Sequence, residues 1–220
     1  IVAHTGREDV RAVARDCAVA LIREGIVVRM VAAEAKDLGL GAAGTDLSVE
    51  TVEEGDDVSV GCELVVVFGG DGTILRSAEL THGDGTPLLG VNLGHVGFLA
   101  EAEYDAVEAT IEAIVDRNYT VEDRLTLDVE VYRGKELVTS TFALNEASVE
   151  KAARERMLEV VVEIDGRPLS RWGCDGVVCA TPTGSTAYNF SAGGPVVWPG
   201  VEALLMVPLT VSDVSGQPLS

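Results

Sequence analysis

The sequence is poor in basic residues. Its 220 residues include 16 Lys and Arg against 36 Asp and Glu, which gives a formal net charge of −20. A protein that binds nucleic acid generally needs a basic surface, so we expect no nucleic acid among its partners. A small anionic substrate would need Arg, Lys or a metal ion beside it to offset the negative field of the chain. Most of the acidic residues are expected on a solvated surface.

Long apolar runs and paired cysteines are also missing. No run approaches the roughly 18 to 20 apolar residues that span a membrane, and no signal peptide is visible, so we expect no membrane partner. The four cysteines include no CxxC pair, which argues against a zinc site. Cys17 falls on an apolar helical stripe and Cys179 in a strand-like run, so we expect buried, reduced thiols. Reduced thiols are typical of a cytoplasmic protein.

The first half of the chain alternates strand-like and helix-like patterns. Ile1–Ala3 is typical of the end of a strand, and apolar residues then recur every three or four positions, which predicts a helix that ends at Gly25. Ile26–Val31 predicts the next strand. Strand, helix and strand at this spacing form a βαβ unit. We therefore expect an α/β domain over residues 1–120, an open, mostly parallel sheet with flanking helices, the last of them over Tyr104–Val115.

The glycines of Gly39–Gly44 match G-x-G-x-x-G, the fingerprint of dinucleotide-binding folds. The fingerprint needs the glycines to follow a strand directly and to open a helix. Here Ala32–Leu38 separates them from the preceding strand, and Thr45–Glu50 follows them. We therefore predict a surface loop at this position, with the dinucleotide fold as the alternative.

The most informative stretch is the apolar run Leu64–Phe68 and the glycine-rich turn Gly69–Thr73 that follows it. The pattern predicts a buried strand, a loop and a helix that begins near Thr73. Glycines let a backbone come close to a ligand with its N–H groups pointing outward. A carboxylate would repel a phosphate there, so Asp71 needs another role. It could hold a magnesium ion, take the proton of a hydroxyl that attacks phosphorus, or only cap the helix.

The helix after this turn is expected to bury Ile74, Leu75 and Ala78. Arg76 falls within its first turns, near enough to the loop to contact a phosphate. A surface ion pair is the alternative for this side chain.

A second loop of interest, Asn92–Leu99, follows a strand predicted over Leu88–Val91. In open α/β sheets, ligands bind at the carboxyl ends of the strands. Phe98 could therefore stack on a base, although a place in the hydrophobic core is an equally good interpretation.

In the second half the pattern changes to that of antiparallel strands. Alternating apolar residues over Leu125–Val131 predict a half-buried strand, and Leu137–Leu144 predicts its partner. Leu158–Ile164 alternates again, and Asp165-Gly166 after it is a strong hairpin signal. We therefore expect an all-β domain over residues 121–220.

Two polar clusters in this region are poor strand material. Asn145-Glu146 follows an apolar segment that ends at Leu144, and Cys174–Ser191 contains a Thr/Ser/Gly tract that is followed by Gly193-Gly194. Hydroxyl donors, accessible backbone and an aromatic ring suit a ligand with sugar hydroxyls and a base. A capped loop that leads into a helix is the alternative.

Taken together, these clusters resemble the NAD kinase family, particularly its actinobacterial members. The matching motifs cover nearly all of the chain up to Pro208, and they are Gly69–Thr73, Asn92–Leu99, Asn145-Glu146, Asp175-Gly176, Thr181–Tyr188 and Gly193–Pro195. The first motif also occurs in phosphofructokinases and in lipid kinases of the diacylglycerol-kinase type. The whole series in this order is highly specific.

The resemblance implies a cytoplasmic enzyme that phosphorylates the adenosine-ribose 2′-hydroxyl of NAD to give NADP. It implies ATP, or in some members inorganic polyphosphate, as the donor, with a divalent metal such as Mg²⁺. Asp71 is implied as the general base that acts on the hydroxyl. The implied phosphate-donor loop consists of Gly69, Gly70, Gly72 and Thr73.

The implied NAD contacts include Asn145 and Glu146 for adenine and ribose, and Asp175 and Ser191 for the nicotinamide half. The resemblance assigns no protein residue as a metal ligand. The complete set of implied NAD contacts is Asp71, Gly72, Arg76, Phe98, Asn145, Glu146, Arg156, Asp175, Thr186, Ala187, Tyr188 and Ser191. The two arginines of this set would supply the local positive charge that a strongly acidic protein needs.

The resemblance further implies a β-sandwich as the second domain, a site between the two domains, and a homodimer or homotetramer. The family normally continues after Pro208 through a His-Ala-Leu-containing segment into further strands, whereas this chain runs through Leu209–Ser220. We therefore expect an incomplete β-rich domain. Two other interpretations are a diacylglycerol-kinase-like lipid kinase, although the GTGND-like motif of that class is missing, and a non-catalytic NAD-binding module, against which the intact Asp71 argues.

Overall fold

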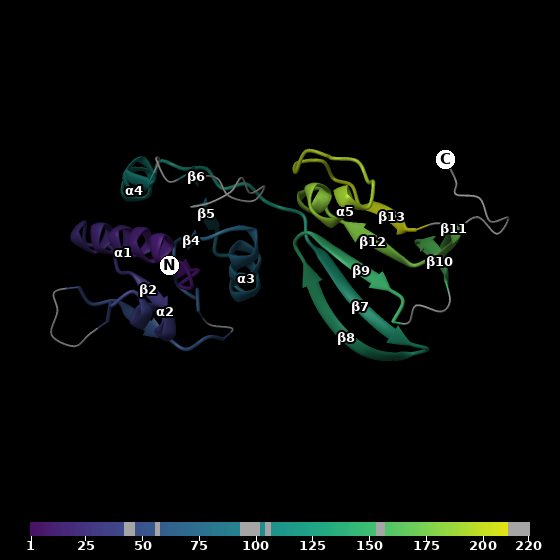
Figure 1. The fold of residues 1–220 in the computed structure, drawn as a ribbon, viewed down its shortest axis with the longest axis horizontal. Coiled ribbons are helices and arrows are strands. Elements are labelled where there is room, and N and C mark those ends of the chain that lie inside the picture. Colours follow the sequence, from purple (N-terminus) through teal and green to yellow (C-terminus); the bar gives the residue numbers. More distant parts are fainter. Residues whose placement is uncertain (42–46, 56–57, 93–101, 104–106, 153–156, 211–220) are drawn as a thin grey trace. The chain divides into compact units, whose positions relative to one another are not determined.

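The computed structural model divides into two compact units, Ile1–Val121 and Glu122–Ser220 (Figure 1). It describes residues 1–41, 47–55, 58–92, 102–103, 107–152 and 157–210. None of the helices within these ranges is long and apolar enough to cross a membrane.

The first unit is built on a parallel sheet. Its strands are β1 (Val2–Ala3), β4 (Val65–Phe68), β5 (Leu88–Asn92) and β6 (Ala102–Glu103), in the order β1-β4-β5-β6. A second parallel pair joins β2 (Arg29–Val31) to β3 (Glu50–Val52). The amino group of Ile1 donates a hydrogen bond to the carbonyl oxygen of Arg29 at 2.7 Å, which ties β2 to the start of β1. The predicted parallel sheet is therefore confirmed.

Helices cover both faces of this sheet. Successive side chains of β4 point to opposite faces and all are apolar, so each face needs a cover. Val65 and Val67 pack with Ile74 of α3 (Asp71–Thr81). Val66 and Phe68 pack on the other face. That face is covered by α1 (Glu8–Arg23), with α4 (Val107–Val115) and the short α2 (Ala32–Asp37) contributing at its margin.

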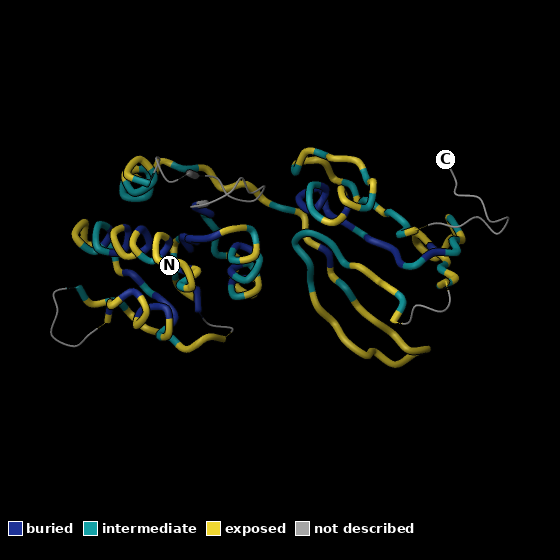
Figure 2. The backbone as a smooth tube through the Cα atoms, in the orientation of Figure 1, coloured by how far each residue is buried: buried dark blue, intermediate teal, exposed yellow. Residues whose placement is uncertain are grey.

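The helix predicted after β1 is confirmed in α1. Its expected apolar stripe is buried, as Figure 2 shows for one side of the helix; the stripe consists of Val10, Val13, Cys17 and Leu21. Gly25 ends the helix with φ +79°, and its N–H donates to the carbonyl of Ile22 at 3.0 Å. Glycine is suited to this position because it adopts a left-handed conformation without a Cβ clash.

Two expectations for the first unit need correction. The strand predicted over Ile26–Val31 is shorter, because regular pairing begins only at Arg29. In α3 the buried residues are Ile74, Ser77 and Thr81, whereas Leu75 and Ala78 are half-buried. The two hydroxyl side chains can be buried because they donate to carbonyls of the same helix, those of Thr73 and Ser77, at 2.8 and 3.0 Å.

Parts of the glycine-rich segment Gly39–Gly44 lie outside the described residues. Gly39 and Gly41 are described and have φ values of +65° and +80°, while residues 42–46 are not described. The prediction of a surface loop over the whole segment therefore stays a prediction.

The second unit is rich in antiparallel sheet. Two hairpins, β7 (Leu127–Arg133) with β8 (Glu136–Ala143) and β10 (Leu158–Ile164) with β11 (Arg167–Cys174), match the predicted pairs. A third sheet has the order β13-β12-β9, with β12 (Gly176–Ala180) between β9 (Glu146–Glu150) and β13 (Leu205–Leu209). Asp165 and Gly166 have φ values of +51° and +72°, which are typical of the two-residue turn that their sequence predicts.

Burial is uneven across these sheets. The central strand β12 is largely buried, whereas most of the β7–β8 hairpin is exposed (Figure 2). Val131, Leu137 and Val138 are 45%, 49% and 50% exposed. Alternation therefore predicted the strands of this hairpin correctly, but the half-burial expected for β7 extends only to Leu127 and Val129.

All four cysteines are free, as expected. Cys17 and Cys174 are buried, but the expected burial is wrong for Cys62 and Cys179, which are partly exposed. Burial raises the pKa of the Cys17 thiol to about 12, so this side chain acts as a small apolar residue of the core.

Candidate functional site

The glycine-rich turn connects β4 directly to α3. The helix begins at Asp71, two residues earlier than the sequence predicts, and Gly70 is its N-cap residue. The N–H groups of Thr73 and Ile74 donate to the carbonyl of Gly70 at 2.9 and 3.2 Å. The N-cap position belongs to Gly70, so Asp71 is not the N-cap residue that the capping interpretation requires. Asp71 is instead the first residue of the helix, where a negative side chain is favoured.

The three glycines of the turn differ in what surrounds them. A Cβ at Gly69 would lie 2.4 Å from Oγ1 and 2.8 Å from Cβ of Thr73, so packing requires glycine there. A Cβ at Gly70 or Gly72 would meet no described atom within 4 Å. The space beside Gly70 and Gly72 is therefore open, so a ligand can come close to the backbone at both residues.

A cavity of about 770 Å³ lies beside this turn within the first unit. Its walls come from the β1–α1 loop, from α2 and from α3. They carry both cationic and acidic side chains, and the lining residues are Ala3, His4, Thr5, Gly6, Arg7, Ala33, Glu34, Asp37, Gly70, Gly72, Thr73 and Arg76. The cavity carries charged side chains and is large enough to admit part of a nucleotide.

The side chain of Arg76 is held by two carboxylates at this cavity. Its Nη1 donates to Oε1 of Glu34 at 2.7 Å, and its Nε and Nη2 donate to Oε1 of Glu54 at 3.0 and 2.8 Å. Burial alone would lower the pKa of Arg76, but the hydrogen bonds to Glu34 and Glu54 outweigh it and raise the pKa above its ordinary value. The ion pair that the sequence allowed for Arg76 is present, and one of its partners, Glu34, is buried rather than at the surface.

In the second unit, the motif after β12 forms a short 3₁₀ helix, η2 (Thr183–Thr186), and the single-turn α5 (Tyr188–Ser191). The hydroxyl of Thr181 donates to the carbonyl of Leu144 at 2.6 Å and accepts the N–H of Gly184 at 3.0 Å. The N–H of Thr181 donates to the carbonyl of Asn145 at 2.8 Å. These bonds bring the two polar clusters predicted from the sequence, at Asn145-Glu146 and after Cys174, into contact.

Several buried polar atoms at this junction have no hydrogen-bond partner among the described residues. They are Oδ1 of Asn145, Oε2 of Glu146, Oγ1 of Thr183 and Oδ1 of Asn189. An unsatisfied buried polar atom lowers the stability of a protein by about 1–3 kcal/mol, so four such atoms at one junction require an explanation. A polar ligand with hydroxyl and amino groups would satisfy donors and acceptors of this kind.

Glu146 carries the one carboxyl group among these four residues. Burial raises its pKa, and the backbone N–H of Tyr188 only partly offsets the effect. The side chain thus combines a buried acceptor oxygen with a reduced tendency to ionise.

We expect Glu146→Gln to stabilise the protein at high pH but not at low pH. Below the ordinary pKa of 4.5 both the folded and the unfolded wild type keep the proton; above it the unfolded state ionises first, so the stability of the wild type falls until the pH passes the higher pKa of the folded state. The variant should therefore melt at a higher temperature than wild type at about pH 8 and at an equal temperature at about pH 4. Thermal melts at both values test this, with Glu163→Gln on the exposed face of β10 as the control. An equal difference at both pH values would contradict the account.

The other predicted NAD contacts are distributed as follows. Asp175 forms an ion pair with Lys151, a residue that sequence reasoning missed. Thr186 and Ala187 are half-buried, and Tyr188 and Ser191 are exposed. Phe98, Arg156 and residues 93–99 of the Asn92–Leu99 loop lie outside the described residues.

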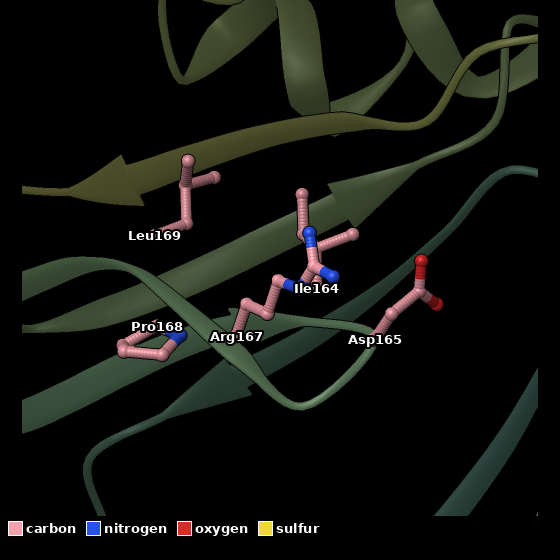
Figure 3. A pocket seen from close by; sticks show the side chains of 5 residues that line it. All are labelled: Ile164, Asp165, Arg167, Pro168 and Leu169. Atoms are coloured by element: carbon pink, nitrogen blue, oxygen red, sulfur yellow. The ribbon is translucent and has the colours of Figure 1, made fainter.

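A smaller cavity of about 370 Å³ lies at the turn of the β10–β11 hairpin (Figure 3). All of its lining residues come from this one turn and are exposed: Ile164, Asp165, Arg167, Pro168 and Leu169. It contains none of the predicted site residues, and it is a surface hollow of the hairpin.

Sequence reasoning also missed Glu34, His4 and Thr5, which line the larger cavity. A signal was available, because the β1–α1 loop leaves the carboxyl end of β1 next to the carboxyl end of β4 in a parallel sheet. The unsatisfied oxygens of Thr183 and Asn189 had no sequence signal beyond their place in the polar motif.

Comparison with known proteins covers both units. The model of the ATP-NAD kinase N-terminal domain matches residues 1–119, and that of the C-terminal domain matches residues 144–219. The NAD kinase of Thermobifida fusca is 56% identical over 223 residues, which cover all of this chain and 68% of that protein. NAD kinase 2 of Streptomyces avermitilis is 53% identical, and the match covers all of this chain and 71% of that protein.

Two solved structures are similar as well. The crystal structure of yeast NADH kinase complexed with NADH has a TM-score of 0.82 at 26% identity, covering 96% of this chain and 64% of that chain. The crystal structure of an NAD kinase from Archaeoglobus fulgidus in complex with ATP has a TM-score of 0.61 at 28% identity, covering 82% of this chain and 74% of that chain.

Proposed function

The chain belongs to the NAD kinase family of phosphotransferases, and from this premise we propose that Asp71 is the general base of the transfer from ATP to NAD. The acceptor is the 2′-hydroxyl of the adenosine ribose, and the product is NADP. One observation carries the assignment of Asp71. This carboxylate is the first residue of α3, and the glycines on either side of it have open space where a side chain would stand.

The first unit supplies the groups for the transfer itself. The Asp71 carboxylate takes the proton of the 2′-hydroxyl as its oxygen attacks phosphorus. The backbone N–H groups of Gly70 and Gly72 lie at the start of α3, where the backbone favours an anion, whereas that of Thr73 donates to the carbonyl of Gly70. Gly69, Gly70, Gly72 and Thr73 form the proposed phosphate-donor loop. Arg76 adds positive charge at the same cavity and is proposed to contact a phosphate of the dinucleotide.

A divalent metal ion, proposed to be Mg²⁺, accompanies the phosphate donor. When bound, it neutralises the charge of the triphosphate. Magnesium at such sites keeps several waters and uses phosphate oxygens, so it needs few protein ligands. The described residues contain no group of three or more His, Cys, Asp or Glu side chains that could hold a metal alone.

The second unit supplies groups for the rest of NAD. Asn145 and Glu146 are proposed to bind adenine and ribose, which their unsatisfied side-chain oxygens support. Asp175 and Ser191 are proposed for the nicotinamide half. The remaining proposed contacts are Thr186, Ala187, Tyr188, Phe98 and Arg156, of which the last-named two lie outside the described residues.

The two other interpretations of the sequence gain no support. The matched family models and the named relatives are NAD kinases, whereas a diacylglycerol-kinase-like lipid kinase or a non-catalytic NAD-binding module would differ from them in activity.

Three further properties are proposed. The exposed apolar side chains of β7 and β8 support a β-sandwich in which another sheet covers them. Exposed apolar surface of this extent also supports a homodimer or homotetramer. The free thiols support a cytoplasmic location.

We expect Gly72→Ala to reduce activity without reducing stability. The added methyl group meets no described atom, so the free energy of unfolding should stay within about 1 kcal/mol of wild type. The same methyl group would displace a phosphate from the backbone, so kcat/KM should fall about 10- to 100-fold.

Kinetics and chemical unfolding of the same preparation test this prediction. Gly69→Ala is the contrasting variant, because its methyl group clashes with Thr73 and should lower stability. A Gly72→Ala variant with wild-type kinetics would show that no ligand approaches this part of the turn.

A further inference from the structure

Glu34 carries a buried carboxylate for which the proposed reaction has no use. Its side chain is 8% exposed, and both of its oxygens are occupied. Oε2 accepts the backbone N–H of Ala3 at 2.9 Å, and Oε1 accepts Nη1 of Arg76 at 2.7 Å. One carboxylate therefore joins the end of β1, the start of α2 and the second turn of α3. All three residues line the cavity that also contains Gly70 and Gly72.

The second partner of Arg76 is of a different kind. The side chain of Glu54 is 56% exposed, and one of its oxygens accepts both Nε and Nη2 of Arg76. An ion pair exposed to this degree contributes little to stability, because water solvates both charges well when they separate. A pair with a buried carboxylate is costly to break, because the carboxylate would be left in the interior without its counter-charge. The two carboxylates therefore differ in how readily they release Arg76.

The exposed partner occupies the part of Arg76 that suits a phosphate. Nε and Nη2 form the edge of the guanidinium group that binds an oxyanion through two parallel hydrogen bonds. The buried partner holds Nη1, at the other end of the group. An anion that enters the cavity can thus replace Glu54 while the bond to Glu34 stays in place.

We propose that Glu34 is a positioning residue that aims Arg76 at a phosphate of the nucleotide substrate, and that Glu54 is a competing carboxylate which this phosphate displaces. The proposal rests on the proposed function, because it takes the anion to be a phosphate of ATP or the pyrophosphate of NAD. Glu34 acts through Arg76 and through the end of β1, and it does not itself contact the substrate.

The two carboxylates should give opposite results when neutralised. Glu54→Gln removes the competitor, so the affinity for the nucleotide should rise about 2- to 5-fold, the size expected for an exposed pair. Glu34→Gln presents an amide in place of one oxygen and cannot accept from both Ala3 and Arg76, so the affinity should fall about tenfold or more, with a smaller change in kcat. Titration calorimetry with ATP and with NAD, each alone, measures both effects without turnover. The nucleotide whose affinity changes is the one that Arg76 contacts.

Two controls separate positioning from a purely structural role. Glu50→Gln removes a carboxylate of the same exposure, 55%, that pairs with Arg29 instead, and it should leave both affinities unchanged. In an Arg76→Gln background, neutralising Glu34 should have no further effect on affinity, whereas a structural role would give additive losses.

The proposal is overturned if Glu54→Gln binds both nucleotides as Glu50→Gln does, or if the effects of Glu34→Gln and Arg76→Gln add. The first comparison stands even if Glu34→Gln does not fold, because Glu54 is at the surface. Failure of the proposed function gives a different result: the wild type then forms no NADP, whether or not it binds the nucleotides.

Discussion

Replacing Asp71 by asparagine should lower the rate of NADP formation about 10²- to 10⁴-fold, the usual contribution of a general base. The amide keeps the size and shape of the carboxylate but cannot take the proton of the ribose hydroxyl. The affinity for NAD should persist, because the remaining polar contacts are unchanged. Stability should change little, since Gly70 and not Asp71 is the N-cap residue of α3. Steady-state kinetics, NAD titration and a thermal melt of the same sample measure the three effects.

The matched control is Asp16→Asn, which removes one negative charge from the exposed face of α1. This variant should keep wild-type turnover, so a general effect of net charge can be set aside. Near-normal NADP formation by Asp71→Asn would refute the assignment of the base, whatever its effect on binding.

The largest effect on folding is expected from Gly184→Ala. A Cβ at this position would lie 2.0 Å from the carbonyl oxygen and 2.4 Å from the carbonyl carbon of Asn145, and both are backbone atoms that cannot rotate away. The 3₁₀ turn would have to move off the start of β9 and break the bonds that Thr181 makes there. We expect a loss of about 3 kcal/mol or more in the free energy of unfolding, at the upper end for overpacking.

Chemical unfolding followed by circular dichroism measures this loss. Gly200→Ala is the matched control in the same unit, because a Cβ there meets no described atom within 4 Å. NAD binding by Gly184→Ala should be lost together with stability, since Asn145 would be displaced. Equal stability of the two variants would contradict the close contact between the turn and Asn145.

The elements that the sequence predicts well are those with local causes. The spacing of apolar residues determines α1, the left-handed Gly25 determines where α1 ends, and Asp165-Gly166 determines the β10–β11 turn. The sequence predicts the start of α3 two residues late, because Asp71 has a side chain that can cap a helix, whereas the true N-cap, Gly70, has none.

The parts of the site that the sequence did not predict depend on contacts between distant residues. Glu34 and Arg76 are 42 positions apart, and Lys151 and Asp175 are 24 apart. No local pattern records such a pair, because its formation depends on how distant segments pack; for Glu34 and Arg76 these segments are α2 and α3. The motifs predict which residues carry the chemistry, and the packed structure determines which carboxylates and cations surround them.

The central claim is that this chain phosphorylates NAD on the adenosine ribose. Its most direct test is to incubate the purified protein with NAD, ATP and Mg²⁺ and to measure NADP with a dehydrogenase that accepts only NADP. We predict that NADP accumulates in step with ADP. A folded protein that binds both nucleotides and yet forms no NADP would contradict the account.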